Sequence, residues 1–176
     1  MYIVVGLGNP NQEHQRTRHN TGRMFTGFVA ENLPADGSGI KILTPNTYMN
    51  DSGPAVTKVI AGKSAKNLIV VYDDLDIPLG EMKISYDRGS GGHRGLESVI
   101  KALKTREFIR IRIGISPTTP TGKLKKPKGE DAVMKFILGE FKPAEVVVLK
   151  KVFKKAKEAL KVMVEDGLEM AMNHCN

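Results

Sequence analysis

The chain contains very little cysteine and no tryptophan. Among its 176 residues Cys175 is the only cysteine, so an internal disulfide is excluded and a reducing compartment is expected. Aromatic residues make up only 6%, which predicts an aliphatic core. No apolar run approaches the roughly 18 residues that a membrane-spanning helix needs, and Met1 leads straight into a predicted strand without a signal peptide. We therefore expect a cytoplasmic protein with no membrane partner.

Acidic residues are also scarce, 19 against 27 basic ones, which gives a formal net charge of +8. This excess favours a polyanionic partner, nucleic acid before membrane, although solubility alone explains it equally well. The basic residues gather on a predicted strand with Arg110 and Arg112, in a loop at 116–130 with Lys123, Lys125, Lys126 and Lys128, and on the last helix with Lys150, Lys154, Lys157 and Lys161. For the helix we favour a solvated face, whereas the loop lysines beside a basic strand suit contacts with a phosphate backbone.

Hydrophobic periodicity predicts strands that alternate with helices. Strands are expected at 2–7, 40–44, 68–72, 82–86 and 108–115, and helices at 22–32, from Ser52, at 96–104, at about 132–139 and at about 144–173. Pro34 and the cluster Asp36-Gly37-Ser38-Gly39 are predicted to end the first helix. This order is typical of an α/β domain with a twisted, mostly parallel (mixed) sheet flanked by helices on both faces. No linker divides the chain, so residues 1–176 are expected to form a single domain.

Two of the predicted buried strands end on polar residues with useful chemistry. The first strand is followed by Asn9 and, one loop later, by His19, and the strand at 68–72 ends on Asp73. If the strands are parallel, these side chains gather at one sheet edge, where α/β proteins bind ligands. An aspartate bonded to one ring nitrogen of a histidine lets the other nitrogen take a proton from water. Two plainer alternatives stay open: His19 as an ordinary loop residue at a helix start, and Asp73 as a turn residue.

Other reaction classes have less support in the sequence. No Gly-x-Ser-x-Gly motif or reactive cysteine is present, so water is the expected nucleophile. The glycines from Gly6 lack the third glycine of a dinucleotide fingerprint, and Gly89–Gly95 lacks the Gly-Lys-Ser/Thr ending of a P-loop. The four histidines share no ligand spacing, so neither a metal nor a cofactor is expected.

Six short segments, taken together, resemble bacterial-type peptidyl-tRNA hydrolases. They occur in the order found in that family and cover most of residues 3–115. The segments are Val4–Pro10, Thr17–Gly22, Pro45–Asn50 with Ser52-Gly53, Asp73–Asp76 with Pro78 and Gly80, Gly91–Leu96, and Arg110–Ile115.

The resemblance implies an enzyme that hydrolyses the ester between a peptide and the terminal ribose of tRNA, which recycles tRNA from aborted translation. It implies that His19 is the catalytic base, that Asp73 orients it, and that Asn9 helps to position the reacting groups. It assigns substrate binding to Tyr48, Met49, Asn50, His93 and Arg94, and tRNA binding to Lys83, Arg88 and Arg112. It also implies a monomer without metal or cofactor, with a mobile lid and tRNA-binding region at 116–140 and a C-terminal helix at 144–173.

The chain departs from the family pattern at several positions. Arg94 replaces the usual asparagine, and an arginine can still donate hydrogen bonds there and meet the tRNA end. His14 stands where tyrosine is common. Ser85 takes the place of the second lysine of the phosphate clamp, for which Lys83 or Arg88 is the expected substitute.

The segment at 33–45 is shorter than in typical members, so a strand or hairpin there is expected to be abbreviated. Two rival functions remain at this point. One is a non-catalytic RNA-binding protein on the same fold, and the other is a nucleosidase or phosphorylase on a similar sheet.

Overall fold

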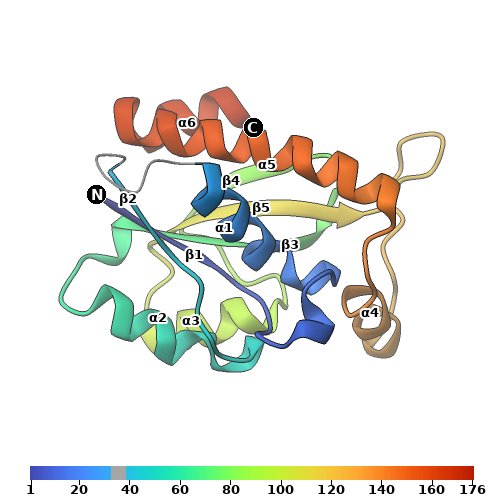
Figure 1. Cartoon of the computed structure of the whole chain (residues 1–176), viewed down its shortest axis with the longest axis horizontal. Coiled ribbons are helices and arrows are strands. Elements are labelled where there is room, and N and C mark those ends of the chain that lie inside the picture. The colour runs from blue at the N-terminus through green and yellow to red at the C-terminus, as the bar shows by residue number, and fades with distance from the viewer. Residues whose placement is uncertain (33–38) are drawn as a thin grey trace.

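A mixed five-stranded sheet forms the centre of the computed structural model, which describes residues 1–32 and 39–176. The strands are β1 (Tyr2–Gly6), β2 (Ile40–Leu43), β3 (Leu68–Pro78), β4 (Met82–Tyr86) and β5 (Ile109–Ser116), in the spatial order β2-β1-β3-β5-β4. β4 runs antiparallel to β5, and every other neighbouring pair is parallel. The predicted mostly parallel sheet is therefore confirmed, and it positions the ends of β1, β3 and β5 at one edge (Figure 1).

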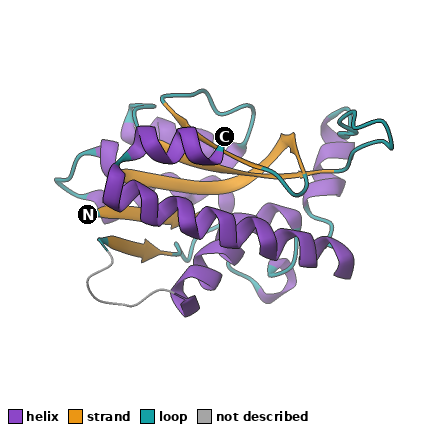
Figure 2. Cartoon of the chain, turned by 90° about the horizontal axis from the view of Figure 1, so that it is seen from above, coloured by secondary structure: helices purple, strands orange, loops and turns teal. Residues whose placement is uncertain are grey.

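Helices cover both faces of this sheet (Figures 1 and 2). They are α1 (Thr21–Asn32), α2 (Ser52–Ile60), α3 (Arg94–Leu103), α4 (Glu130–Ile137), α5 (Pro143–Asp166) and α6 (Leu168–Cys175). α1, α5 and α6 pack on one face, and α2 and α3 pack on the other. α4 stands apart, near the carboxyl end of β5 (Figure 1). No helix in the described part of the chain is long and apolar enough to cross a bilayer.

The two cores follow from the alternation of side chains along the strands. In β3, Ile69 and Val71 face the helices α1, α5 and α6, whereas Val70 and Tyr72 face α2 and α3. Both cores are largely aliphatic, as the scarcity of aromatics predicts. Since both faces are covered, β3 is buried along its first half and has fixed register with β1 and β5.

β3 continues beyond its predicted end at Tyr72. Asp73 pairs in register with Ile113 of β5, and the strand ends only at Pro78 after an irregularity. Asp73 is thus held by a parallel ladder rather than by a turn, which removes the turn alternative for this residue.

The helix predicted over 144–173 is instead two helices. α5 ends at Asp166, and Gly167 has a φ of 91°, a conformation that suits glycine and interrupts the helix. α6 then packs back against α5 (Figure 1). The residues predicted to end the first helix, Pro34 and Asp36 to Ser38, lie outside the described residues, as does this part of the shortened segment at 33–45.

Gly22, the second residue of α1, lies where this helix meets β1 and β3. A Cβ at this position would stand 2.2 Å from the carbonyl oxygen of Val71 and 2.6 Å from the amide nitrogen of Leu7. We expect Gly22→Ala to lower the free energy of unfolding by about 2 kcal/mol, because backbone atoms must shift. Gly27→Ala is a matched control in the same helix, with nothing within 4 Å of its added Cβ. It should leave stability unchanged or raise it by up to about 1 kcal/mol. Urea denaturation measures both, and equal stabilities would contradict the expectation.

Candidate active site

His19 lies in a short 3₁₀ helix, Arg18–Asn20, between the loop after β1 and the start of α1. The residues around it fix this turn, since Asn20 N donates to Thr17 O at 3.0 Å and Thr21 Oγ1 donates to Arg18 O at 2.7 Å. The imidazole is buried, with 6% of the residue exposed. His19 is therefore held in place by its backbone rather than left mobile in a loop.

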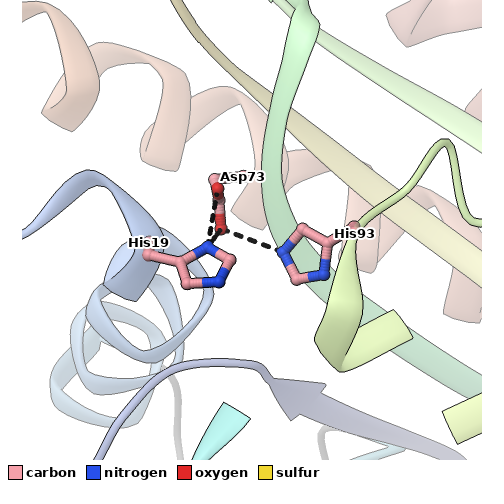
Figure 3. Close-up of side chains that lie close together, drawn as sticks. All are labelled: His19, Asp73 and His93. Atoms are coloured by element: carbon pink, nitrogen blue, oxygen red, sulfur yellow. Dashed lines mark hydrogen bonds and ion pairs between the residues drawn. The ribbon is translucent and has the colours of Figure 1, made fainter. Parts of the chain in front are cut away.

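Asp73 joins His19 to a second histidine, His93 (Figure 3). Nδ1 of His19 lies 3.1 Å and 3.0 Å from the two carboxylate oxygens, and Nε2 of His93 lies 3.1 Å from Asp73 Oδ1. The predicted pairing of His19 with Asp73 is present. The contact between Asp73 and His93 was not foreseen, because His93 precedes α3 in a distant loop and nothing in its spacing indicates Asp73.

The hydrogen bonds define the tautomers of both rings. The backbone N–H of Leu96 donates to His93 Nδ1 at 3.2 Å, so the hydrogen of this ring is on Nε2 and is donated to Asp73. In His19 the hydrogen on Nδ1 points at the carboxylate. Nε2 of His19, which makes no hydrogen bond to any described residue, is then the nitrogen that can accept a proton.

Electrostatics favour an ionised Asp73 and a readily protonated His19. Burial opposes ionisation of Asp73, but His19 and His93 hold the pKa of this carboxyl well below its ordinary range. Burial also lowers the pKa of His19, and so does the charge of Arg94, yet Asp73 outweighs both and raises the pKa of the imidazole above 6.5. The pair therefore combines an ionised carboxylate with a histidine whose pKa is raised above its ordinary value.

Asn9 is oriented by the side chain of Asn20 and by the backbone N–H of Met49. Its backbone N–H donates to Asn20 Oδ1 at 2.8 Å, while Asn20 Nδ2 donates to Asn9 O at 2.8 Å. The N–H of Met49 donates to Asn9 Oδ1 at 2.9 Å, which identifies that atom as the oxygen. The amide Nδ2 of Asn9 is thereby left as a donor at the cleft. The part played by Asn20, whose side chain ties the two segments together, was missed at the level of sequence.

These residues line one cleft with a volume of about 660 Å³. Ten of the predicted site residues line it, namely Asn9, His19, Tyr48, Met49, Asn50, Asp73, Arg88, His93, Arg94 and Arg112. Lys83 does not: it is exposed on β4, opposite Arg112 in the antiparallel ladder. The far wall comes from Lys126, Glu130 and apolar residues of α4, so part of the predicted lid region borders the site.

The two arginines of β5 are buried, so they do not form an exposed basic face on the strand. Arg112 is buried and donates Nε to Asp74 Oδ2 at 2.8 Å. Arg110 is fully buried, stacks over the Phe108 ring and donates to the carbonyl oxygen of Arg88. Arg110 thus anchors the start of the glycine-rich loop and is not available to a polyanion on the surface.

Arg18 is a further site residue that sequence reasoning did not single out. Its guanidinium donates to Glu145 Oε2 at 2.9 Å and stacks over the rings of Phe136 and Phe141. Its backbone N–H donates to Gly139 O at 3.0 Å. The segment that carries His19 is therefore attached to the junction of α4 and α5, a contact across more than a hundred residues with no local signal.

His19, Asp73 and His93 are also the group of described residues best suited to hold a metal ion. Their ligand atoms lie within 4.8 Å of one another, and two imidazoles with a carboxylate are ligands that zinc accepts. Their separations in the sequence follow no ligand motif, which is why spacing did not indicate them. The ligand atoms already form hydrogen bonds with one another, so the geometry needs no ion to explain it, and a site without metal remains a prediction.

The molecule is a single-domain α/β protein with a buried histidine–aspartate pair in a cleft at the edge of a mostly parallel sheet. Because Nε2 of His19 makes no hydrogen bond to a described residue, this site is suited to general-base chemistry. Comparison with known proteins makes this more specific. The family model described as peptidyl-tRNA hydrolase matches residues 3–176. The chain belongs to the peptidyl-tRNA hydrolase family.

Individual relatives agree with this assignment over nearly their whole length. The chain is 40% identical to a peptidyl-tRNA hydrolase of Aquifex aeolicus over 192 residues, covering 99% of this chain and 95% of the relative. It is also 40% identical to a peptidyl-tRNA hydrolase of Thermotoga maritima over 188 residues, covering 99% of this chain and 96% of the relative. Among solved structures, a peptidyl-tRNA hydrolase of Acinetobacter baumannii has a TM-score of 0.85 at 27% identity, covering 100% of this chain and 94% of that one.

Proposed function

We propose that this chain hydrolyses the ester bond of peptidyl-tRNA, with His19 as the general base that activates water. The observation that carries the proposal is the buried pair of His19 and Asp73, which leaves Nε2 of His19 as the proton acceptor at the cleft. Membership of the family supports the substrate class. A base positioned in this way contributes about 10²–10⁴-fold to a rate.

The reaction follows from the groups at the cleft. Nε2 of His19 takes a proton from water as the water oxygen attacks the ester carbonyl, and a tetrahedral oxyanion forms. Asn9 Nδ2 is oriented to donate a hydrogen bond to this oxyanion, and one such donor contributes about 10²–10³-fold. The ester C–O bond then breaks, and the proton on His19 Nε2 passes to the leaving ribose oxygen. Asp73 remains ionised throughout and stabilises the imidazolium.

The cleft offers separate surfaces to the two parts of the substrate. Met49 and the apolar residues of α4 suit the peptide, while the exposed Tyr48 and Asn50 supply polar contacts beside them. A site that pairs with the peptide amide rejects a free aminoacyl ester, because its own polar groups would be left unpaired. Arg88, at the rim, and Lys83, outside it, are the cations assigned to tRNA phosphates, with Arg112 as a buried support.

The finer attributes of this function are proposals as well. We infer a monomer that works in the cytoplasm, where translation supplies the substrate, and that needs no metal. Residues 116–140 are proposed to act as the lid and as part of the tRNA-binding surface. The net charge of +8 and the single, buried cysteine are consistent with this setting.

The test is the release of tRNA from an N-acetyl-aminoacyl-tRNA by the native chain, with the corresponding aminoacyl-tRNA as the comparison substrate. We expect turnover of the acetylated ester, little turnover of the free aminoacyl ester, and no loss of rate in excess EDTA. Native protein that binds the acetylated tRNA without releasing it would support the non-catalytic alternative. The intact pair of His19 and Asp73 disfavours that alternative, since RNA binding alone does not require it.

A further inference from the structure

We infer that Arg94 is a specificity-determining residue, which binds the phosphodiester nearest the ester bond of the tRNA end. In the free protein Glu130 holds the guanidinium of Arg94, and the substrate phosphate displaces Glu130. This inference rests on the proposed function, because it names the substrate group that Arg94 contacts. It goes beyond the substrate-binding role expected for Arg94, because it names the phosphate that the guanidinium binds and the carboxylate that this phosphate displaces.

Arg94 is next to the reacting groups. It is the first residue of α3 and directly follows His93, whose ring donates to Asp73. Its side chain lines the cleft and is half exposed. Its charge is close enough to lower the pKa of His19, although Asp73 outweighs this effect. A cation at this position is within the electrostatic reach of whatever lies next to the scissile ester.

Glu130 is the only ion-pair partner of Arg94 among the described residues. Nη2 of Arg94 donates to Glu130 Oε1, from the first residue of α4 on the opposite wall of the cleft. The side chains are 50% and 75% exposed, respectively. Exposed ion pairs of this kind contribute little to stability and exchange partners readily. The contact is therefore suited to hold the guanidinium temporarily, not to fix the fold.

The other cations of the cleft are less suited to this task. Arg112 is buried in its ion pair with Asp74, and breaking a buried ion pair is strongly unfavourable. Lys126 presents a compact ammonium from the late loop, without the planar fork of an arginine. Arg88 is exposed at the start of the glycine-rich loop, which suits phosphates further along the tRNA. Arg94 alone combines exposure, a fork of donors and sequence adjacency to His93.

The substrate supplies the matching anion. In peptidyl-tRNA the ester is on the ribose of the last nucleotide, and a phosphodiester joins this nucleotide to the one before it. One ribose therefore separates that phosphate from the ester carbonyl, which is attacked by the water that His19 activates. A guanidinium binds phosphate through two parallel charge-assisted hydrogen bonds, which are stronger than neutral ones. An ester that lacks this phosphate cannot displace Glu130, so Arg94 distinguishes tRNA esters from other peptide esters.

The experiment compares two small esters that differ by one phosphate. The first is N-acetyl-aminoacyl adenosine, and the second is the same ester of cytidylyl-adenosine. Arg94→Gln keeps amide donors and removes the charge. Because the charge of Arg94 also lowers the pKa of His19, both esters are compared at a pH on the plateau above the His19 inflection. There we expect kcat/KM for the dinucleotide ester to fall by about 10–100-fold more than kcat/KM for the adenosine ester. Arg94→Lys should restore part of the loss, because the charge returns without the fork.

Glu130→Gln tests the displaced partner. It frees Arg94, so kcat/KM for the dinucleotide ester should rise by about 2–5-fold relative to kcat/KM for the adenosine ester. Arg106→Gln removes a similarly exposed arginine that does not line the cleft and pairs with Asp87, so it should leave kcat/KM for both esters unchanged. All variants are checked for folding by circular dichroism.

Three results would overturn the inference. Arg94→Gln could lower kcat/KM equally for both esters, which would give Arg94 a role independent of phosphate. Arg94→Gln could instead leave kcat/KM for both esters unchanged. Finally, Glu130→Gln could lower turnover of the dinucleotide ester. Failure of the native chain to release tRNA from N-acetyl-aminoacyl-tRNA would instead reject the proposed function itself, so the two failures are distinguishable.

Discussion

Replacement of His19 by alanine should lower kcat/KM for peptidyl-tRNA by about 10²–10⁴-fold, the range that a positioned general base contributes. The variant retains Asp73 and its hydrogen bond from His93, but no group at the cleft can take the proton from water. Steady-state release of tRNA from N-acetyl-aminoacyl-tRNA measures the effect. Affinity for uncharged tRNA should change little, since His19 is buried and is not one of the cations assigned to tRNA phosphates.

His174→Ala is the control for this experiment. His174 is an exposed residue of α6 and does not line the cleft, so its loss should leave both activity and stability near those of the native chain. If His19→Ala retains activity within about tenfold of the native chain, His19 is not the base.

Asp73→Asn should be nearly as damaging, with a loss of about 10²-fold or more in kcat/KM. The reason lies in the tautomers. His93 must donate from Nε2, because its Nδ1 already accepts from the Leu96 N–H, so the single amide oxygen of the asparagine will pair with His93. The amide NH₂ then faces His19 Nδ1, which places the hydrogen of this ring on Nε2 and blocks it as a base.

The pH dependence of the same variant provides an independent readout. In the native chain kcat/KM should rise with pH through an apparent pKa above 6.5, because Asp73 raises the pKa of His19. Without the carboxylate, burial and the charge of Arg94 remain, and both lower the pKa of His19, so the inflection of the residual activity should move below 6.5. Asp87→Asn, at an exposed aspartate with a φ of 42° that asparagine tolerates, is the matched control and should shift nothing. An unshifted inflection in Asp73→Asn would contradict the assignment.

The same pKa shifts predict how stability depends on pH. Asp73 has a lowered pKa in the folded state, so its contribution is present above its unfolded value of 3.8 and is lost as the pH falls. His19 has a raised pKa, so its contribution is complete below 6.5 and is lost as the pH rises through the folded value. Between about pH 6 and about pH 9 the native chain should therefore lose more stability than Asp73→Asn does, which urea denaturation at both values measures.

Features set by local pattern were predicted well from the sequence. The run of β-branched residues at 68–72 identified the central strand, and its carboxyl end led to Asp73 and, through the parallel arrangement, to its pairing with His19. The strand at 82–86 was predicted to the residue. These succeeded because the side-chain period and the position of strand ends are local properties that determine which residues share an edge.

Features that depend on distant contacts were not predictable. The buried position of Arg110 depends on the aromatic ring of Phe108 and on the carbonyl of Arg88, neither of which marks an arginine as buried. Gly167 in an otherwise amphipathic stretch gave only a weak signal, because an isolated glycine is tolerated inside helices; here the packing of α6 on α5 decides the outcome. The pairing of Arg94 with Glu130 likewise spans the cleft and leaves no mark on either segment.

The attachment of Arg18 to Glu145, Phe136 and Phe141 limits the motions that are open to the cleft. Glu145 of α5 holds the guanidinium of Arg18. A rigid-body swing of α4 would pull the Phe136 ring away from this guanidinium and break the hydrogen bond from Arg18 Nη1 to Phe136 O. It would also pull on the backbone of the turn that holds His19. A wide-open cleft is then a state with a displaced base, so substrate entry and catalytic competence are mechanically linked. Hinge-like bending is left to residues 117–129, which connect β5 to α4.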